Sequence, residues 1–178
     1  MFTQPTLSTT RLVLRPFLMG DAATVQRLAG VHEIAFTTLH VPHPYKDGMA
    51  EAWIRTHAAA WGRNELAAFA ITEPAVGLIG AITLRIESAH RRAELGYWVG
   101  APYWGQGYAT EAALVTVRFG FDKLDLHRIY ASHLTRNPAS GRVMVKVGME
   151  YEGCLRQHIL KWGIYEDVSR YGILRTVS

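Results

Sequence analysis

The 178-residue chain has one cysteine, no long hydrophobic run and no dense cluster of charge of one sign. The single Cys154 excludes an internal disulfide framework and a cysteine-rich zinc site. The best candidate for a membrane span, residues 66–84, is interrupted by Glu73 and Pro74. The first residues also lack the basic start and apolar stretch of a secretory signal. We therefore expect a soluble protein of the cytoplasm.

Basic charge is present but dispersed. Lysine and arginine number 19 against 15 acidic residues, a net charge of +4, and the longest basic run is Arg91-Arg92. Such a surface does not predict a direct nucleic-acid role. An RNA-associated protein is the competing class, and RNA binding that falls steeply with salt would favour it. A content of 49% hydrophobic residues excludes a disordered chain. Without repeats or linkers, residues 1–178 are expected to form a single domain.

The spacing of apolar residues predicts a mixed α/β fold. Ile82, Leu84 and Ile86 alternate with smaller or polar residues, as in a half-buried strand, and a helical period begins after Gly107. Residues 31–48 are expected to be irregular. The predicted order is β-αα-βββ-α-β-α-ββ. Its strands fall at 11–17, 66–72, 78–87, 91–100, 128–134, 149–159 and 165–174, and its helices at 21–29 (capped by Asp21), 47–62, from 107 and from 138.

A glycine-containing loop at residues 102–112 joins a predicted strand to a predicted helix. Free backbone N–H groups and the positive end of the helix dipole suit a phosphate there, and Gly105 and Gly107 allow close approach of the backbone. The loop is not a P-loop, because the Gly-Lys-Ser/Thr ending is absent. It is not a dinucleotide fingerprint either, since Thr110 stands where glycine or alanine is needed.

Taken together, the motifs resemble the GNAT superfamily of acetyl-CoA-dependent N-acetyltransferases, and within it the RimJ/RimL-type branch. The segment from Trp104 to Ala109 matches the family's pyrophosphate loop at Gly107 and Ala109, with Trp104 in place of the usual arginine or glutamine. The further matches are Thr9 or Thr10 through Arg15, Glu94-Leu-Gly-Tyr-Trp98, Asn137-x-x-Ser140 and Lys146-x-Gly148-Met149.

The resemblance implies a GNAT fold whose sheet splays between residues 95–99 and 128–134, where strand backbone pairs with pantetheine. It implies acetyl-CoA as co-substrate and direct transfer to an amine, without a metal. A homodimer is common in this branch. The implied cofactor-binding residues are Tyr97, Trp98, Val99, Trp104, Gly105, Gln106, Gly107, Tyr108, Ala109, Thr110, Asn137 and Ser140.

Two residues are candidates for catalysis. Glu94 shares a strand face with Arg92, so it either pairs with that arginine or accepts the proton of the acceptor amine, through a water. Ser140 is either a solvated helix-start serine or, by the resemblance, the group that holds or protonates the leaving thiolate. Asn137 caps its helix and, by the resemblance, also contacts pantetheine. The tyrosines that could supply a phenol instead are Tyr130, Tyr151 and Tyr165.

Other reactive side chains are assigned no chemistry. Cys154 lacks a local His or Asn signature and is interpreted as an inert buried residue. His40 and His43 are the only close histidine pair, and no third ligand lies at a metal-site spacing. The aromatic segment 31–48 is expected to wall the acceptor pocket. The acceptor is interpreted as a peptide N-terminus of the ribosomal-protein type, and the alternative acceptor is a small amine. The alternative to an enzyme is a non-catalytic acyl-CoA-binding module.

Overall fold

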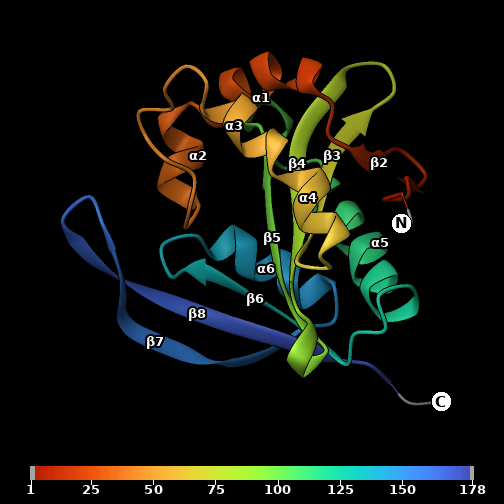
Figure 1. Ribbon diagram of the computed structural model, residues 1–178. Coiled ribbons are helices and arrows are strands. Elements are labelled where there is room, and N and C mark those ends of the chain that lie inside the picture. The colour runs from red at the N-terminus through yellow and green to blue at the C-terminus, as the bar shows by residue number, and fades with distance from the viewer. Residues whose placement is uncertain (1–2, 177–178) are drawn as a thin grey trace.

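A computed structural model describes residues 3–176, which form one eight-stranded sheet with helices on both faces (Figure 1). The strand order is β1-β2-β3-β4-β5-β6-β8-β7, and every neighbouring pair is antiparallel except β5 and β6. The mixed α/β fold expected from the sequence is confirmed. The strands are β1 (Leu7–Ser8), β2 (Val13–Pro16), β3 (Leu66–Glu73), β4 (Gly77–Glu87), β5 (Arg92–Val99), β6 (Arg128–Leu134), β7 (Glu150–Lys161) and β8 (Ile164–Leu174).

Helices cover the two faces of the sheet unequally. On one face, α1, α2 and α3 bury Val25, Ile34 and Ile54 against Ala70 and Leu78 of the sheet. On the other face, α5 and α6 pack on the larger apolar side chains of β3, β4 and β5. The helices are α1 (Ala22–Ala29), α2 (His32–Thr37), α3 (Met49–Arg55), α4 (His57–Gly62), α5 (Tyr108–Asp122) and α6 (Pro138–Lys146); the short 3-10 turns are η1 (Met19–Asp21), η2 (Ser88–His90) and η3 (Ala101–Tyr103).

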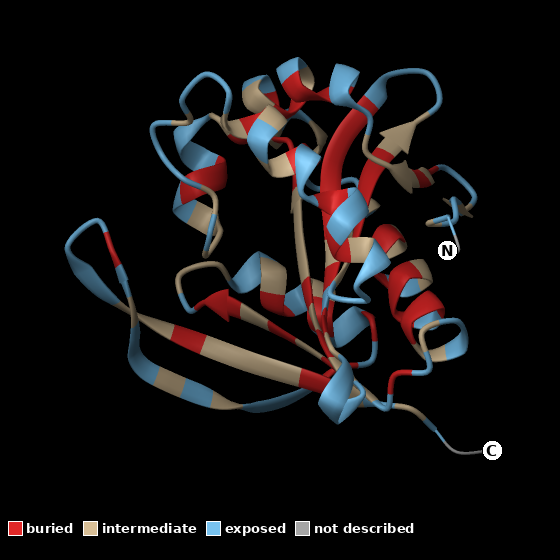
Figure 2. Cartoon of the chain, in the orientation of Figure 1, coloured by how far each residue is buried: buried red, intermediate tan, exposed pale blue. Residues whose placement is uncertain are grey.

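The alternation seen in the sequence has the expected outcome in β4. Ile82, Leu84 and Ile86 point to the face covered by α5 and are almost fully buried. The buried residues in Figure 2 accordingly concentrate in the central strands and the inner sides of the helices, while β7 at the sheet edge is mostly exposed. The central strands therefore provide a rigid platform for the connections between β5, α5, β6 and α6.

Three local predictions are corrected. The segment 31–48 is not entirely irregular, because α2 forms there with Ile34 and Ala35 buried against neighbouring elements. The helix expected over 47–62 is broken at Thr56, whose hydroxyl donates to the carbonyl of Trp53 (2.7 Å) and competes with the helical ladder.

Asp21 occupies the N-cap position of α1, but its side chain does not cap that helix. Its carboxylate accepts two hydrogen bonds from Arg15 (both 2.8 Å) and one from the backbone N–H of Leu18 (2.8 Å). Burial opposes ionisation of Asp21, but these hydrogen bonds outweigh burial and lower the pKa of Asp21. The pair therefore attaches the start of α1 to β2.

The sheet opens between β5 and β6. The two strands pair only at Arg92–Arg128, Ala93–Ile129 and Glu94–Tyr130, whereas β5 stays paired with β4 as far as Val99. Beyond Glu94, the edge of β5 that faces β6 has no strand partner among the described residues. This is the splay that the GNAT resemblance implies, and on β5 it starts at Leu95, the first residue of the expected range 95–99.

Candidate active site

A cavity of about 740 Å³ lies where β5 and β6 separate. Its walls come from β4, β5, the loop before α5, one side of α6 and the segment around residues 37–45. The volume falls within the range of about 300–1,000 Å³ that is usual for ligand pockets. Because β5 forms the floor and its free edge is exposed there, an extended ligand can pair with its backbone inside the cavity.

The glycine loop lies at one end of this cavity. Gly105 (φ +75°) and Gly107 (φ +81°) adopt the left-handed conformation, and Gly107 directly precedes the fifteen-residue helix α5. The loop residues that line the cavity are Trp104, Gly105, Gly107, Tyr108, Ala109 and Thr110. The positive end of α5 therefore points toward the cavity, as an anion site requires.

Two predicted loop residues have other partners. The Trp104 indole donates to the carbonyl of Val99 (2.5 Å), so it fastens the loop to the end of β5. Gln106 is not among the residues that line the cavity, and its carbonyl accepts a hydrogen bond from Arg11 (3.0 Å). Gln106 thus supports the shape of the loop from outside.

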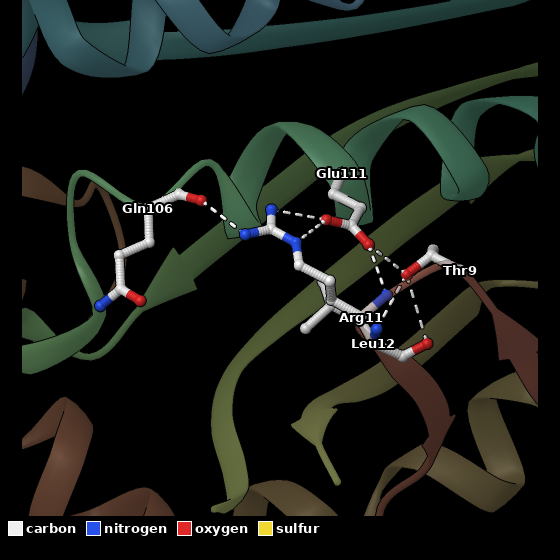
Figure 3. A network of polar contacts seen from close by, with 5 residues as sticks. All are labelled: Thr9, Arg11, Leu12, Gln106 and Glu111. Atoms are coloured by element: carbon white, nitrogen blue, oxygen red, sulfur yellow. Dashed lines mark hydrogen bonds and ion pairs between the residues drawn. The ribbon is translucent and has the colours of Figure 1, made fainter. Parts of the chain in front are cut away.

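A polar network holds the loop against the N-terminal segment (Figure 3). Glu111, in the first turn of α5, accepts hydrogen bonds from the Thr9 hydroxyl (2.6 Å), the Arg11 backbone N–H (3.0 Å) and Arg11 Nε (2.7 Å). The Arg11 guanidinium also lies over the Tyr108 ring at 4.7 Å. Sequence reasoning noticed the motif containing Arg11 but not its contact with Glu111, because 100 residues separate the two.

Ser140 lies beside a buried phenol. The Tyr97 hydroxyl is 2.8 Å from Ser140 Oγ and 3.1 Å from the Ser140 carbonyl oxygen. Burial raises the pKa of Tyr97 to about 12, against a smaller opposite effect of the Ser140 hydrogen bond. The phenol therefore keeps its proton at neutral pH. Tyr97 was predicted to contribute backbone contacts, and sequence reasoning missed its side chain, which alternation places on the face toward α6.

Asn137 has the predicted capping geometry. Its Oδ1 accepts from the backbone N–H of Ser140 (3.3 Å), and its Nδ2 donates to the carbonyl of Thr37 (2.9 Å). The second bond joins the start of α6 to the end of α2. Asn137 therefore fixes the position of Ser140 and attaches the 37–45 segment to the rest of the cavity wall.

Glu94 lines the same cavity and is not paired with Arg92, which corrects one of the two alternatives for this residue. Arg92 instead forms an ion pair with Glu87 (2.7 Å), which also accepts from Tyr130 (3.0 Å). The cross-strand neighbour of Glu94 on β4 is Arg85. Glu94 is therefore left available to a ligand.

Some predicted side chains lie elsewhere. Tyr151 and Tyr165, two of the candidate phenols, are 57% and 64% exposed, and neither lines the cavity. Cys154 is exposed on β7, so its assignment as a buried residue was wrong. Within residues 3–176, no group of three or more His, Cys, Asp and Glu side chains could hold a metal ion, and no helix could cross a membrane.

The comparisons with known proteins identify the family. The model for the acetyltransferase (GNAT) domain matches residues 11–150. The N-acetyltransferase YoaA of Bacillus subtilis (strain 168), described as uncharacterized, is 32% identical over 96% of this chain and 97% of its own. The chain therefore belongs to the GNAT acetyltransferases and is an N-acetyltransferase.

Solved structures agree with this assignment. A GNAT-family acetyltransferase from Bacillus anthracis superposes with a TM-score of 0.84 at 26% identity, covering 96% of this chain and 98% of that one. RimJ of Mycobacterium smegmatis, solved with a CoA-disulfide, has a TM-score of 0.82 at 27% identity, covering 92% and 81%. These similarities confirm the GNAT fold and agree with a RimJ/RimL-like branch.

The acceptors named among relatives differ. The ribosomal-protein-serine acetyltransferase of Escherichia coli (strain K12) is 34% identical, over only 53% of each chain. The spermidine N(1)-acetyltransferase of Vibrio cholerae is 27% identical over 93% of this chain and 94% of its own. The acceptor of this chain therefore has to be argued from its own site.

Proposed function

We propose that this N-acetyltransferase binds acetyl-CoA along the free edge of β5 and transfers the acetyl group directly to a primary amine at a peptide N-terminus. The observation that carries this proposal is the cavity at the splay, which joins the glycine loop at the start of α5 to the carboxylate of Glu94. The pyrophosphate lies against the loop from Trp104 to Thr110, and pantetheine pairs with the backbone of Tyr97, Trp98 and Val99. We also take residues 1–178 as one domain, acting in the cytoplasm.

The chemistry needs a proton acceptor for the amine and a proton donor for the thiolate. The ammonium first loses one proton to Glu94 through a water, and the neutral amine nitrogen then attacks the thioester carbonyl carbon, so that the C–N bond forms and the C–S bond breaks. The departing thiolate takes a proton from Ser140 or from the hydrogen-bonded Tyr97 phenol, and the second proton released by the nitrogen as the amide forms restores that donor. The raised pKa of Tyr97 supports a donor that is protonated before the reaction.

The peptide acceptor is supported by the ribosomal-protein relative and by the edge of β6 beyond Tyr130, which faces the splay and can align an extended chain. The spermidine relative supports a small amine as the second candidate. A thiol-release assay with acetyl-CoA separates them: peptides that begin with Ser, Ala or Thr should react and their N-terminally blocked forms should not. Turnover of a polyamine or amino acid beside inert peptides would replace the first candidate with the second.

The role of Glu94 is tested by Glu94→Gln, which keeps the shape and removes the proton acceptor. We expect kcat to fall by about 10²-fold, with little change in acetyl-CoA affinity. Glu150→Gln, at an exposed position of β7, is the matched control and should behave as the unchanged protein. An unchanged pH profile and rate in Glu94→Gln would assign deprotonation to another group.

A further inference from the structure

Two opposite charges lie side by side at the acceptor side of the cavity. Arg85 on β4 and Glu94 on β5 are direct cross-strand partners, and both line the cavity. Side chains in such a pair project from Cβ atoms about 4.5–5.5 Å apart. The two residues nevertheless form no ion pair in the described part of the chain. Each is therefore free to bind a group of the opposite charge on a ligand.

The other cations near this end of the cavity already have partners. Lys161 is buried and donates to the carbonyl of Thr38 (2.6 Å), and Arg136 forms an ion pair with Glu166. Arg85, by contrast, is exposed at the cavity mouth and has no hydrogen-bond acceptor within residues 3–176. An arginine fork without a partner is well suited to a carboxylate, which it binds through two parallel hydrogen bonds.

The local charge balance favours the same kind of ligand. Desolvation lowers the pKa of His40, the positive charges of Arg85 and Lys161 lower it further, and Glu94 acts in the opposite direction. His40 is therefore neutral at pH 7 and adds no positive charge. Around His40, the negative charge of Glu94 is set against the positive charges of Arg85 and Lys161, so a ligand with several ammonium groups is opposed and a ligand with an anionic group is favoured.

We propose that the acceptor carries a carboxylate close to its reacting amine, and that Arg85 binds this carboxylate while Glu94 faces the amine. The inference rests on the proposed function and specifies its substrate class. The carboxylate has two chemical sources, the α-carboxylate of a free amino acid and an acidic side chain next to a peptide N-terminus. The two sources share the same recognition by a guanidinium, so the experiment has to distinguish them.

The test uses matched amines in the thiol-release assay. Serine is compared with serinamide, and the amidated peptide Ser-Asp-Ala with Ser-Asn-Ala; spermidine is the polycation. In one of the two pairs, we expect the compound with the carboxylate to have a kcat/KM about 10- to 100-fold above that of its neutral partner, mainly through a lower KM. Spermidine should be a poor substrate. The pair that shows the difference identifies the source of the carboxylate.

Variants connect that preference with Arg85. Arg85→Ala should reduce the ratio of kcat/KM between the carboxylate-bearing amine and its neutral partner to near one. The kcat/KM of the neutral amine should stay almost unchanged, and Arg85→Lys should restore part of the ratio. Arg118→Ala, an exposed arginine of α5 outside the cavity lining, is the matched control and should keep the full ratio. The assignment is overturned if neither carboxylate is preferred, or if Arg85→Ala slows charged and neutral amines equally. If no amine releases thiol from acetyl-CoA, the proposed function itself is contradicted, and not only the role of Arg85.

Discussion

The network around Glu111 allows a quantitative prediction that links the stability of the protein to the position of the glycine loop. Glu111 accepts hydrogen bonds from the Thr9 hydroxyl, the Arg11 backbone N–H and the Arg11 guanidinium, at 2.6–3.0 Å. Its side chain is 19% exposed and that of Arg11 is 46% exposed. Glu111→Gln retains one acceptor oxygen and turns an NH₂ group toward Arg11 or Thr9, so at least one donor loses its acceptor.

The cost follows from these contacts. Hydrogen bonds to a charged group contribute about 1.5–3 kcal/mol, whereas the ion pair of the half-exposed Arg11 adds at most about 1 kcal/mol. We therefore expect Glu111→Gln to lower the free energy of unfolding by about 2 kcal/mol, which corresponds to a fall in Tm of roughly 4–8 °C for a chain of this size. Because Arg11 also donates to the carbonyl of Gln106, the affinity for CoA should fall as well.

The pH dependence has a definite sign. Burial opposes ionisation of Glu111, but the hydrogen bonds from Thr9 and Arg11 outweigh it and lower the pKa of Glu111 below its ordinary value of 4.5. Its contribution to stability is therefore complete above about pH 4.5 and is lost as the pH falls through the folded-state pKa. Thermal melts of the two proteins should differ most near pH 7 and converge at strongly acidic pH.

Two comparisons make this prediction refutable. Glu65→Gln disrupts the exposed Arg63–Glu65 pair and should leave Tm unchanged within error. A double-mutant cycle of Glu111→Gln with Arg11→Met should show a clear coupling energy. Equal effects of the two glutamate variants, or a coupling near zero, would mean that the network does not stabilise the loop.

Three further predictions test the site. Gly107→Val should weaken CoA binding measured by calorimetry, because a β-branched residue is strained at φ +81° and obstructs the loop; Gly77→Val, at φ +89° in a distant open turn, controls for strain and should bind normally. Tyr97→Phe should lower kcat more than acetyl-CoA affinity, and an unchanged kcat would make the phenol a packing residue. Cys154→Ala should retain full activity, whereas an acetyl group found on Cys154 by mass spectrometry would contradict direct transfer.

Local patterns in the sequence were sufficient for most elements of the fold. The alternation in β4, the boundaries of β6 and the Asn137-Pro138 start of α6 depend on neighbouring residues, and all three were predicted. The short helix α2 was missed because its six residues carry little periodicity, and its buried Ile34 is held by tertiary packing. Elements with a strong local pattern were thus predictable together with their ends, while a short element held by tertiary packing was not.

The site was predictable in its backbone and much less so in its side chains. The glycine loop has a local signature, because left-handed φ values and a following helix start require particular residues. The contacts Arg11–Glu111 and Tyr97–Ser140 join residues 100 and 43 positions apart, and no local pattern specifies them. The Arg92–Glu94 pair, one of the two alternatives for Glu94, does not form, since the β4–β5 turn brings Glu87 to Arg92 instead.

In the proposed mechanism, the two faces of β5 separate the chemistry of the donor from that of the acceptor. Leu95, Tyr97 and Val99 face α5 and α6, where the glycine loop and Ser140 lie. Glu94 and Trp98 face the other side, with the 37–45 segment above them. Because one strand carries both sets, substitutions in that segment or at Arg85 can change the acceptor while the cofactor side stays intact. This division gives a physical reason why relatives with the same domain have names that specify acceptors as different as a ribosomal protein and spermidine.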